Sequence, residues 1–210
     1  MKTILAAALF LSFLFAKAQT ADSIGSILNS PGRFFLKFDT KNSFITNTRA
    51  DIWGVKTGIQ FARKIKTGIG YSWLHTKLEK NIIITPDTVS ALLTFNYPEL
   101  YFEYVFYSTR RWEFSIPLQL AAGNSFYRYS LNGSKFVQDK HIMMLYEPAV
   151  SLQYKIVRWF GIGGDIGYRL VLVRNKAIPE NFNSPLYSFK ALIYYDELYE
   201  MIFKKPLFKK

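Results

Sequence analysis

Apolar and polar residues alternate along most of this chain, most clearly over residues 51–61. One parity of this segment holds Trp53, Val55, Thr57, Ile59 and Phe61. The other parity holds Ile52, Gly54, Lys56, Gly58 and Gln60. Successive side chains of a strand point to opposite faces, so the segment predicts a strand with one apolar and one small or polar face. Strands with one face suited to lipid and the other to a polar interior are typical of transmembrane β-barrels.

Similar alternation marks further segments along the chain. We expect strands at about 33–40, 50–62, 64–75, 97–108, 111–124, 143–156, 159–172 and 186–196. Each has about the 9–11 residues that cross a bilayer at a steep tilt, or slightly more. Tight connections alternate with longer polar segments, which cover 40–50, 76–96, 126–141 and 173–185. Such barrels have short periplasmic turns and long outer loops. We therefore predict an all-β fold, an eight-stranded antiparallel transmembrane β-barrel over residues 33–196, with both of its ends in the periplasm.

The tryptophans give a second indication of the same fold. Trp53 and Trp73 lie near the expected outer ends of their strands. Trp112 and Trp159 adjoin tight turns at the expected inner ends. Interfacial tryptophans form aromatic belts at both membrane surfaces, so all four positions suit a membrane-spanning barrel.

Charged residues recur on the parity that faces the interior. The expected lumen cations are Arg33, Lys37, Lys56, Lys66, Lys155, Arg169 and Lys190. The expected lumen anions are Asp39, Glu99, Glu103, Glu113, Glu147 and Asp165. These charges nearly balance, and charges in a low-dielectric interior need partners. An eight-stranded barrel is just wide enough for side chains to fill it, so we expect a structural ion-pair network and a filled lumen, not a pore.

Three prolines and the C-terminal segment depart from the simple pattern. Pro98, Pro117 and Pro148 fall within or at the start of expected strands, where proline removes a ladder donor. Pro117 lies in mid-strand on the inward parity, which predicts either a bulge or a divided strand. Beyond the barrel, residues 196–203 have helical spacing, so we expect a periplasmic helix and basic tail over 197–210.

The N-terminus has the pattern of a secretory signal peptide. Lys2 precedes an apolar run over 4–15, and Ala16-Lys17-Ala18 supplies small residues for cleavage after residue 18. We expect residues 19–32 to form a flexible N-terminal segment. The apolar run is shorter than a spanning helix requires. The chain contains no cysteine, which excludes disulfides and a lipidated cysteine.

Composition is basic and rich in aromatic residues. The formal net charge is +12, and aromatic residues make up 18% of the chain. A basic, aromatic-rich chain is compatible with nucleic-acid binding. However, a secretory signal directs the chain away from nucleic acid, and the basic residues are scattered rather than clustered. We therefore expect an outer-membrane location, contact with outer-membrane lipid and lipopolysaccharide, and no nucleic-acid partner.

Candidate catalytic residues are few. His75 and His141 fall near expected outer strand ends, at heights similar to Ser72 and Ser125. A histidine beside a serine or an acid could support nucleophilic catalysis, but exposed rim histidines are the favoured interpretation. Glu99, Glu103 and Glu113 could be acid–base groups, although ion pairing is favoured. We expect no catalytic residues, no cofactor and, with two histidines and no cysteine, no metal site.

With these features, the chain resembles the small outer-membrane β-barrels of Gram-negative bacteria, the OmpX/OmpA-like porin family and the PorT-like barrels. The resemblance covers residues 33–196, and residues 54–61 and 160–169 carry it best. The C-terminus departs from the terminal aromatic residue that is usual in these families. Members include adhesion, membrane-stabilising and secretion-accessory proteins, so the resemblance implies no single function.

We therefore expect a monomeric, non-enzymatic barrel that acts as a structural, interaction or secretion-accessory protein of the envelope. Residues 76–96, with Ile82-Ile83-Ile84, are the expected contact surface for an envelope protein partner. Two alternatives remain open from the sequence. The first is a lipid-modifying enzyme of the lipid A deacylase or acyltransferase kind, and the second is a small diffusion channel.

Overall fold

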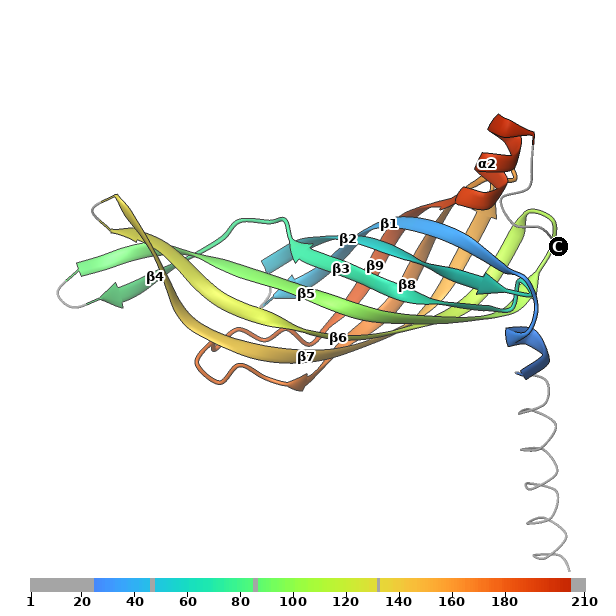
Figure 1. The fold of residues 1–210 in the computed structure, drawn as a ribbon. Helices are drawn as coiled ribbons and strands as arrows, with labels where there is room; N and C mark the ends of the chain where they lie inside the picture. The colour runs from blue at the N-terminus through green and yellow to red at the C-terminus, as the bar shows by residue number, and fades with distance from the viewer. Residues whose placement is uncertain (1–24, 46–47, 85–86, 132, 205–210) are drawn as a thin grey trace, which may run out of the picture.

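The computed structural model describes residues 25–45, 48–84, 87–131 and 133–204 of the 210-residue chain. These residues form one antiparallel sheet and a C-terminal helix (Figure 1). The strands are β1 (Gly32–Ile45), β2 (Thr48–Phe61), β3 (Ile65–Leu74), β4 (Leu78–Ile84), β5 (Asp87–Ser108), β6 (Trp112–Leu131), β7 (Ser134–Lys155), β8 (Phe160–Val173) and β9 (Ser184–Tyr194). The helix is α2 (Tyr195–Phe203). The expected signal peptide, residues 1–18, lies outside the described residues.

Eight of the strands close into a barrel. Each strand pairs with its neighbour in antiparallel register, β1 pairs with β9, and β3 pairs with β5. β4 pairs only with β5 among the described residues and lies beyond the closed ring. The predicted eight-stranded antiparallel barrel is therefore confirmed.

The strands extend well beyond the lengths that the sequence predicted. Segments expected as loops at 40–50, 76–96 and 126–141 are largely strand, and β5 and β7 each have 22 residues. Equating strand length with membrane thickness was wrong, because the hairpins β4–β5 and β6–β7 keep pairing after they leave the bilayer. Paired strands satisfy their own backbone groups in water as well as in lipid. Between β8 and β9, residues 174–183 form a loop without strand structure, as expected.

The prolines interrupt hydrogen bonding without breaking strands. Pro117 is buried within a continuous β6, so neither expected outcome, a bulge or a divided strand, occurs at this residue. Instead, the pairing between β6 and β7 is interrupted between Ser115 and Leu118, both of which remain paired. Similar gaps adjoin Pro98, between β5 and β6, and Pro148, between β7 and β8. Proline lacks the backbone donor, and at each of these points the strand loses only its hydrogen bonds to one neighbouring strand.

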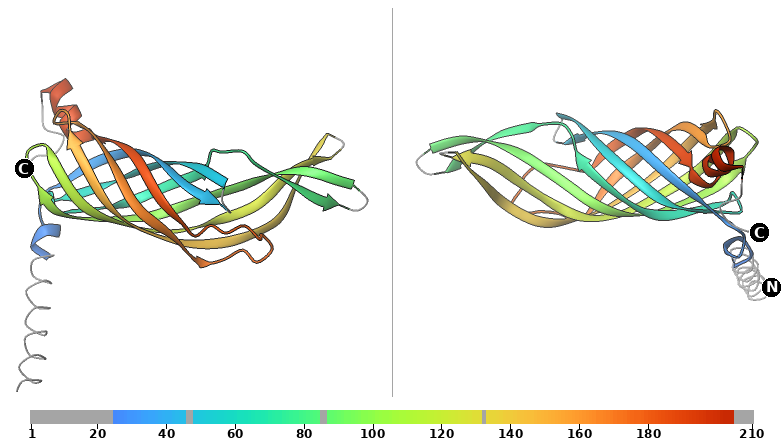
Figure 2. Two further views of the ribbon diagram at one scale, coloured as in Figure 1. Left: turned by 180° about the vertical axis from the view of Figure 1, so that it is seen from behind. Right: turned by 45° about the horizontal axis from the view of Figure 1, so that its top comes forward.

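The periplasmic end combines tight turns with both termini of the barrel (Figure 2). Between β2 and β3, Ala62 and Arg63 have φ values of 45° and 57°, the left-handed conformation of a type I′ turn. α2 follows β9 directly and ends where Lys204 adopts φ 53°, with its N–H bonded to Glu200. Before β1, residues 25–28 form a helical turn within the segment expected to be flexible.

The outside of the barrel is an apolar belt. Ile69, Leu100, Ile166 and Phe189 are 62–75% exposed, although aliphatic and aromatic residues of this size are normally buried in soluble domains. Trp53 pairs directly with Trp73 at one end of the belt, and Trp112 begins β6 at the other. The tryptophans therefore lie at the two rims that the sequence predicted. Such an exterior fits hydrocarbon with aromatic anchors at its interfaces.

Candidate functional site

The lumen of the barrel is filled by buried charged residues. Eleven of the thirteen expected lumen residues have less than 5% of their surface exposed: Lys37, Asp39, Lys56, Lys66, Glu99, Glu103, Glu113, Glu147, Asp165, Arg169 and Lys190. Each comes from an inward position of its strand, opposite the apolar belt. Removing these groups from water is costly, so their stability depends on how they pair.

Glu147 and Glu99 organise one group of pairs. Lys41 Nζ lies 2.7 Å from Glu147 Oε2 and 3.1 Å from Glu99 Oε2. The other oxygen of Glu147 accepts a bond of 2.6 Å from Arg169 Nε. Lys56 then links Glu99, at 3.0 Å, to a second carboxylate at 2.6 Å, that of Asp39. Charges from five strands thus form one continuous network.

A second group of pairs lies nearer the periplasm. Lys66 Nζ lies between Glu103, at 3.0 Å, and Glu113, with which it also forms an ion pair. The carboxylates that could have formed an acid–base pair are therefore joined through a shared lysine. Lys190 pairs with Asp165 at 2.7 Å. Lys37 lies over the ring of Tyr101 at 4.0 Å and makes a cation–π contact there.

Two expected lumen residues lie at the periplasmic rim instead. Arg33 is 34% exposed and pairs with Glu197 of α2. Lys155 is partly buried, lies 3.8 Å from Glu113, and contacts the ring of Tyr194. Both residues occupy strand ends, and only Arg33 reaches out of the barrel, whereas Lys155 still faces the buried Glu113 and Tyr194. The alternation of faces alone could not predict the ion pair between Arg33 and Glu197, because it does not determine where α2 lies.

Lys41, which is 1% exposed and central to the network, is not among the expected lumen residues. The first expected strand ends at residue 40, which assigns Lys41 to an outer loop. The signal was nonetheless present, since Lys37, Asp39 and Lys41 follow the same period of two. The strand continues to Ile45, which places Lys41 on the inward face.

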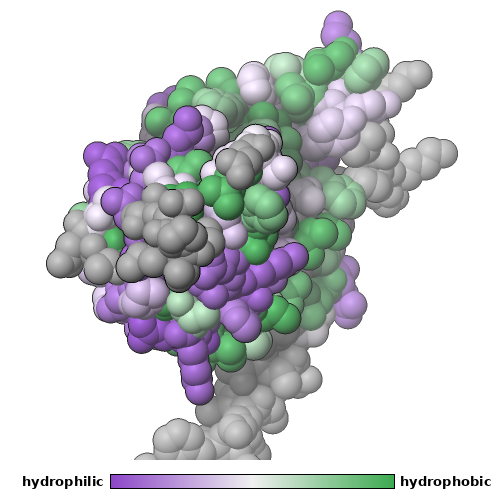
Figure 3. Space-filling model, turned by 90° about the vertical axis from the view of Figure 1, so that its left-hand side faces the viewer, coloured by the Kyte–Doolittle hydropathy of each residue, from purple (hydrophilic) through white to green (hydrophobic). Residues whose placement is uncertain are grey.

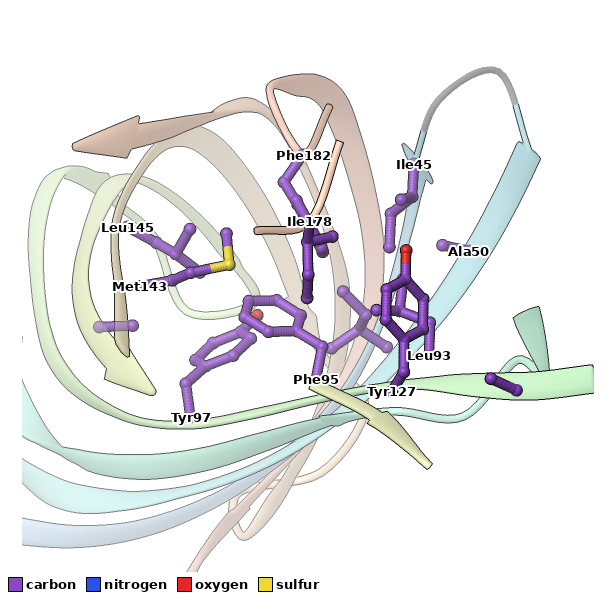
Figure 4. Close-up of a cluster of buried hydrophobic side chains, with 13 residues drawn as sticks. Ile45, Ala50, Leu93, Phe95, Tyr97, Tyr127, Met143, Leu145, Ile178 and Phe182 are labelled. Atoms are coloured by element: carbon purple, nitrogen blue, oxygen red, sulfur yellow. The ribbon is translucent and has the colours of Figure 1, made fainter. Parts of the chain in front are cut away.

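An apolar plug fills the extracellular half of the lumen (Figure 4). The plug consists of Ile45, Ala50, Ile52, Ala91, Leu93, Phe95, Tyr97, Ala121, Tyr127, Met143, Leu145, Ile178 and Phe182. Ile178 and Phe182 come from the loop between β8 and β9, which folds back into the barrel mouth. The ring of Phe182 lies 5.1 Å from that of Phe95. This plug closes over the ionic network, and no sequence pattern predicted it.

Polar contacts fix the same loop to the barrel wall. The Asn175 amide, 1% exposed, donates to Ser125 Oγ at 3.0 Å and to the carbonyl of Asp139 at 2.8 Å. Glu180 pairs with Lys80 of β4 at 2.6 Å and accepts a hydrogen bond from Tyr127 of β6. Burial opposes ionisation of Glu180, but the bonds from Lys80 and Tyr127 outweigh it and lower the pKa of Glu180.

A sheet projects beyond the barrel on the extracellular side (Figure 1). It consists of β4 and the outer parts of β5, β6 and β7, in that order. Among the described residues, β4 has no partner on its outer side, and β7 pairs with β8 only from Met144 onward. Both edges of the projecting sheet are therefore open. Seen end-on, hydrophilic side chains gather around this end, with hydrophobic ones on the flanks (Figure 3).

Exposed apolar residues accompany one open edge. Phe136 and Val137, in the outer part of β7, are 43% and 53% exposed. The expected contact residue Ile82 behaves differently, since it is half-buried and packs against the apolar plug. The side chains of Ile83 and Ile84 lie outside the described part of the chain.

His141 lies opposite Ser125 in the β6–β7 register, but the side chains of the two histidines and the two candidate serines have different partners. His75 stacks on Trp53, with ring centroids 4.5 Å apart, while Ser72 bonds to Glu99 in the lumen. His141 is exposed, and the nearby Ser125 bonds to Asn175. Within the described residues, neither histidine side chain forms a hydrogen bond to a serine or an acid, and no cluster of histidine, aspartate and glutamate could hold a metal ion.

Comparisons with known proteins identify the fold. No family model matches the chain, and no curated protein matches it. Over the described residues, no helix has the length and apolarity needed to cross a membrane. Neisserial surface protein A is a similar solved structure, with a TM-score of 0.56 and 11% identity, covering 79% of this chain and 99% of that one.

Two further solved structures are similar at lower scores. The N-terminal β-barrel domain of OprF from Pseudomonas aeruginosa has a TM-score of 0.48 and 14% identity, covering 78% of this chain and 98% of that one. Ail, the attachment invasion locus protein of Yersinia pestis, has a TM-score of 0.47 and 10% identity, covering 78% and 96%. With its apolar belt and charged lumen, the protein is an outer-membrane β-barrel.

Proposed function

We propose that this protein is a non-enzymatic interaction protein of the outer membrane, of the small porin-family or PorT-like kind. In this proposal its projecting sheet binds a protein partner at the cell surface, and its barrel serves as the membrane anchor. The observation that carries the proposal is the pair of open sheet edges outside the barrel. Unpaired edges present rows of backbone donors and acceptors that can accept an added strand.

The arrangement of the lumen supports an anchor more than a channel. Ion pairs occupy the periplasmic half, and the plug containing Ile178 and Phe182 occupies the extracellular half. A solute would have to displace both. An enzymatic role has less support, because catalysis requires a nucleophile and a base within hydrogen-bonding reach. Among the described residues, neither His75 nor His141 forms a side-chain hydrogen bond to a serine or an acid, although Ser125 lies opposite His141 in the strand register.

The outer part of β7 is the better-exposed docking edge. Residues 134–138 are exposed along their whole length, and they include Phe136 and Val137. β4 is partly covered, since Ile82 packs on the plug and Lys80 pairs with Glu180. Added strands gain affinity from backbone hydrogen bonds and specificity from side-chain contacts, and this edge offers both.

The proposal can be tested by site-specific photocrosslinking in whole cells. A photoreactive residue at Val137 is expected to give one discrete protein adduct. The same probe at Lys176, which is exposed on the loop at the same side of the membrane, is the matched control and is expected to give none. Both variants should retain the shift in gel migration on heating that is characteristic of folded barrels.

Absence of any protein adduct at Val137, in cells where the folded barrel is present at normal levels, would refute the proposed partner. Equal adducts from both positions would show contact without a preference for the sheet edge. That outcome also contradicts the proposal.

A further inference from the structure

The lipid-facing columns of β7 and β8 both end in basic residues at the extracellular rim. Along β7 the outward residues Val150, Met144 and Ile142 are 43–65% exposed. The next residues toward the outside are His141 and Lys140. Along β8 the outward column ends at Leu172, and the next outward position is Arg174. The change from apolar to cationic side chains on adjacent strands marks the outer membrane interface.

Asn175 holds the loop between β8 and β9 so that two further basic residues lie at the extracellular rim of β7 and β8. Its buried amide donates to Ser125 on β6 and to the carbonyl of Asp139 on β7. The flanking residues Arg174 and Lys176 are both exposed. Anchoring the amide inside the barrel mouth therefore places two cations on its outside, next to Lys140 of β7.

These groups surround one hollow of about 640 Å³ outside the barrel wall. The hollow is lined by Asn124, Lys140, His141, Ile142, Arg174, Asn175, Lys176 and Ala177. No carboxylate is among them. Within the described residues, Lys140 and Lys176 make no ion pair or side-chain hydrogen bond, and Arg174 donates only to the carbonyl of Pro179, at 3.0 Å. The cations are therefore available for an external anion.

We propose that this hollow binds a phosphate group of an outer-leaflet lipid, the phosphorylated glycolipid lipid A. Phosphate is the matching chemistry, since lysine and arginine donate charge-assisted hydrogen bonds to its oxygens. A lipid source is favoured over free phosphate because Ile142 lies in the wall of the hollow, at the top of the apolar column. A bound headgroup there leaves its acyl chains lying along Met144 and Val150. This site is independent of the projecting sheet edge and of the proposed protein partner.

Purified protein in uncharged detergent micelles allows a direct test. The midpoint temperature of barrel unfolding is measured during titration with diphosphoryl lipid A, with its fully dephosphorylated counterpart, or with inorganic phosphate. Diphosphoryl lipid A is expected to raise the midpoint, and the other two additions are expected to leave it unchanged. The double variant Lys140→Ala/Lys176→Ala should need roughly 30-fold more diphosphoryl lipid A for the same effect, from a typical contribution per basic residue at a lipid surface.

A charge-matched variant separates this site from general attraction. Lys77→Ala/Lys135→Ala removes two exposed cations on the same side of the membrane and outside the hollow. It is expected to respond like the unmodified protein. Equal loss in both double variants would overturn the site. Equal stabilisation by the dephosphorylated lipid would show that phosphate is not recognised, and equal stabilisation by inorganic phosphate would overturn the lipid source.

Discussion

At the scale of single residues, the lumen shows how buried charges are kept stable. Lys41 is held by two carboxylates and by Gln119 at 2.8 Å. Lys66 is likewise held by two carboxylates and by Gln153 at 3.2 Å. Shared acceptors matter because an isolated buried charge is strongly unfavourable, whereas a well-paired one offsets most of its desolvation cost. The network is therefore sensitive to the loss of any residue that serves two partners.

Glu147→Ala tests this sensitivity. The change leaves Arg169 without its carboxylate and Lys41 with only one, so we expect it to lower the free energy of unfolding by about 3–5 kcal/mol. Urea unfolding in lipid vesicles measures this loss. Glu79→Ala, an exposed acid on β4, is the control and should leave the unfolding midpoint unchanged. A Glu147→Ala barrel as stable as the unmodified protein would contradict an energetic role for the network.

At the scale of elements, the loop 174–183 behaves as part of the barrel interior. Its apolar residues enter the plug, and Glu180 ties it to β4 and β6. Loops usually run over the surface because their backbone groups need water. This one is an exception at two apolar positions, while most of its other residues remain exposed.

Acidification should release this loop. Hydrogen bonds from Lys80 and Tyr127 lower the pKa of Glu180 below its ordinary value of 4.5 despite partial burial. A depressed carboxyl pKa contributes stability above the unfolded pKa, and that contribution is lost as pH falls through the folded value. Hydrogen exchange of residues 174–183, corrected for intrinsic rates, should therefore stay constant from pH 7 to about 5 and rise only below 4.5.

Glu180→Gln provides the control for that experiment. It removes the titrating group, so exchange in the loop should be faster at pH 7 and should lose its additional rise in acid. A transition in the unmodified protein above pH 5, or an unchanged transition in Glu180→Gln, would assign the pH dependence to another group.

At the scale of the whole molecule, the barrel is inverted relative to a soluble protein. Around its membrane-facing belt large apolar residues are exposed while the charges lie buried in the lumen, an arrangement that is stable only when hydrocarbon surrounds the belt. The long hairpins leave the apolar belt and carry a polar sheet into the extracellular medium. One chain thus combines a membrane-embedded cylinder with an aqueous projecting sheet.

Ile166→Lys tests the position of the belt. Ile166 lies at the middle of β8 and is 75% exposed, so we expect a lysine there to cost about 2–4 kcal/mol in vesicles. Ile162→Lys, nearer the periplasmic end of the same strand, should cost less, because the penalty falls toward the interface. Equilibrium unfolding in urea compares the two. If both lysine variants lowered the free energy of unfolding by an equal and negligible amount, lipid would not cover this face of the barrel.

The sequence by itself determined the facing of the strands, because period-two alternation assigns each side chain to lipid or to the lumen. It therefore placed the tryptophans and nearly all of the network residues. Continuing the period-two alternation of the first strand from Asp39 to the next inward position would have included Lys41. Only the tertiary structure decided where strands stop, because β4, β5, β6 and β7 continue through pairing with each other rather than through contact with lipid.

The tertiary structure also decided what closes the barrel and where basic residues gather. Phe182 meets Phe95, and Glu180 meets Lys80, across 87 and 100 residues of sequence respectively. Such contacts depend on how a loop folds back onto a completed ring. The local sequence pattern does not predict how the loop folds back, since apolar and polar residues follow no regular period within the loop. The physical reason is that strand periodicity is a property of neighbouring residues, whereas plugging the mouth is a property of the closed cylinder.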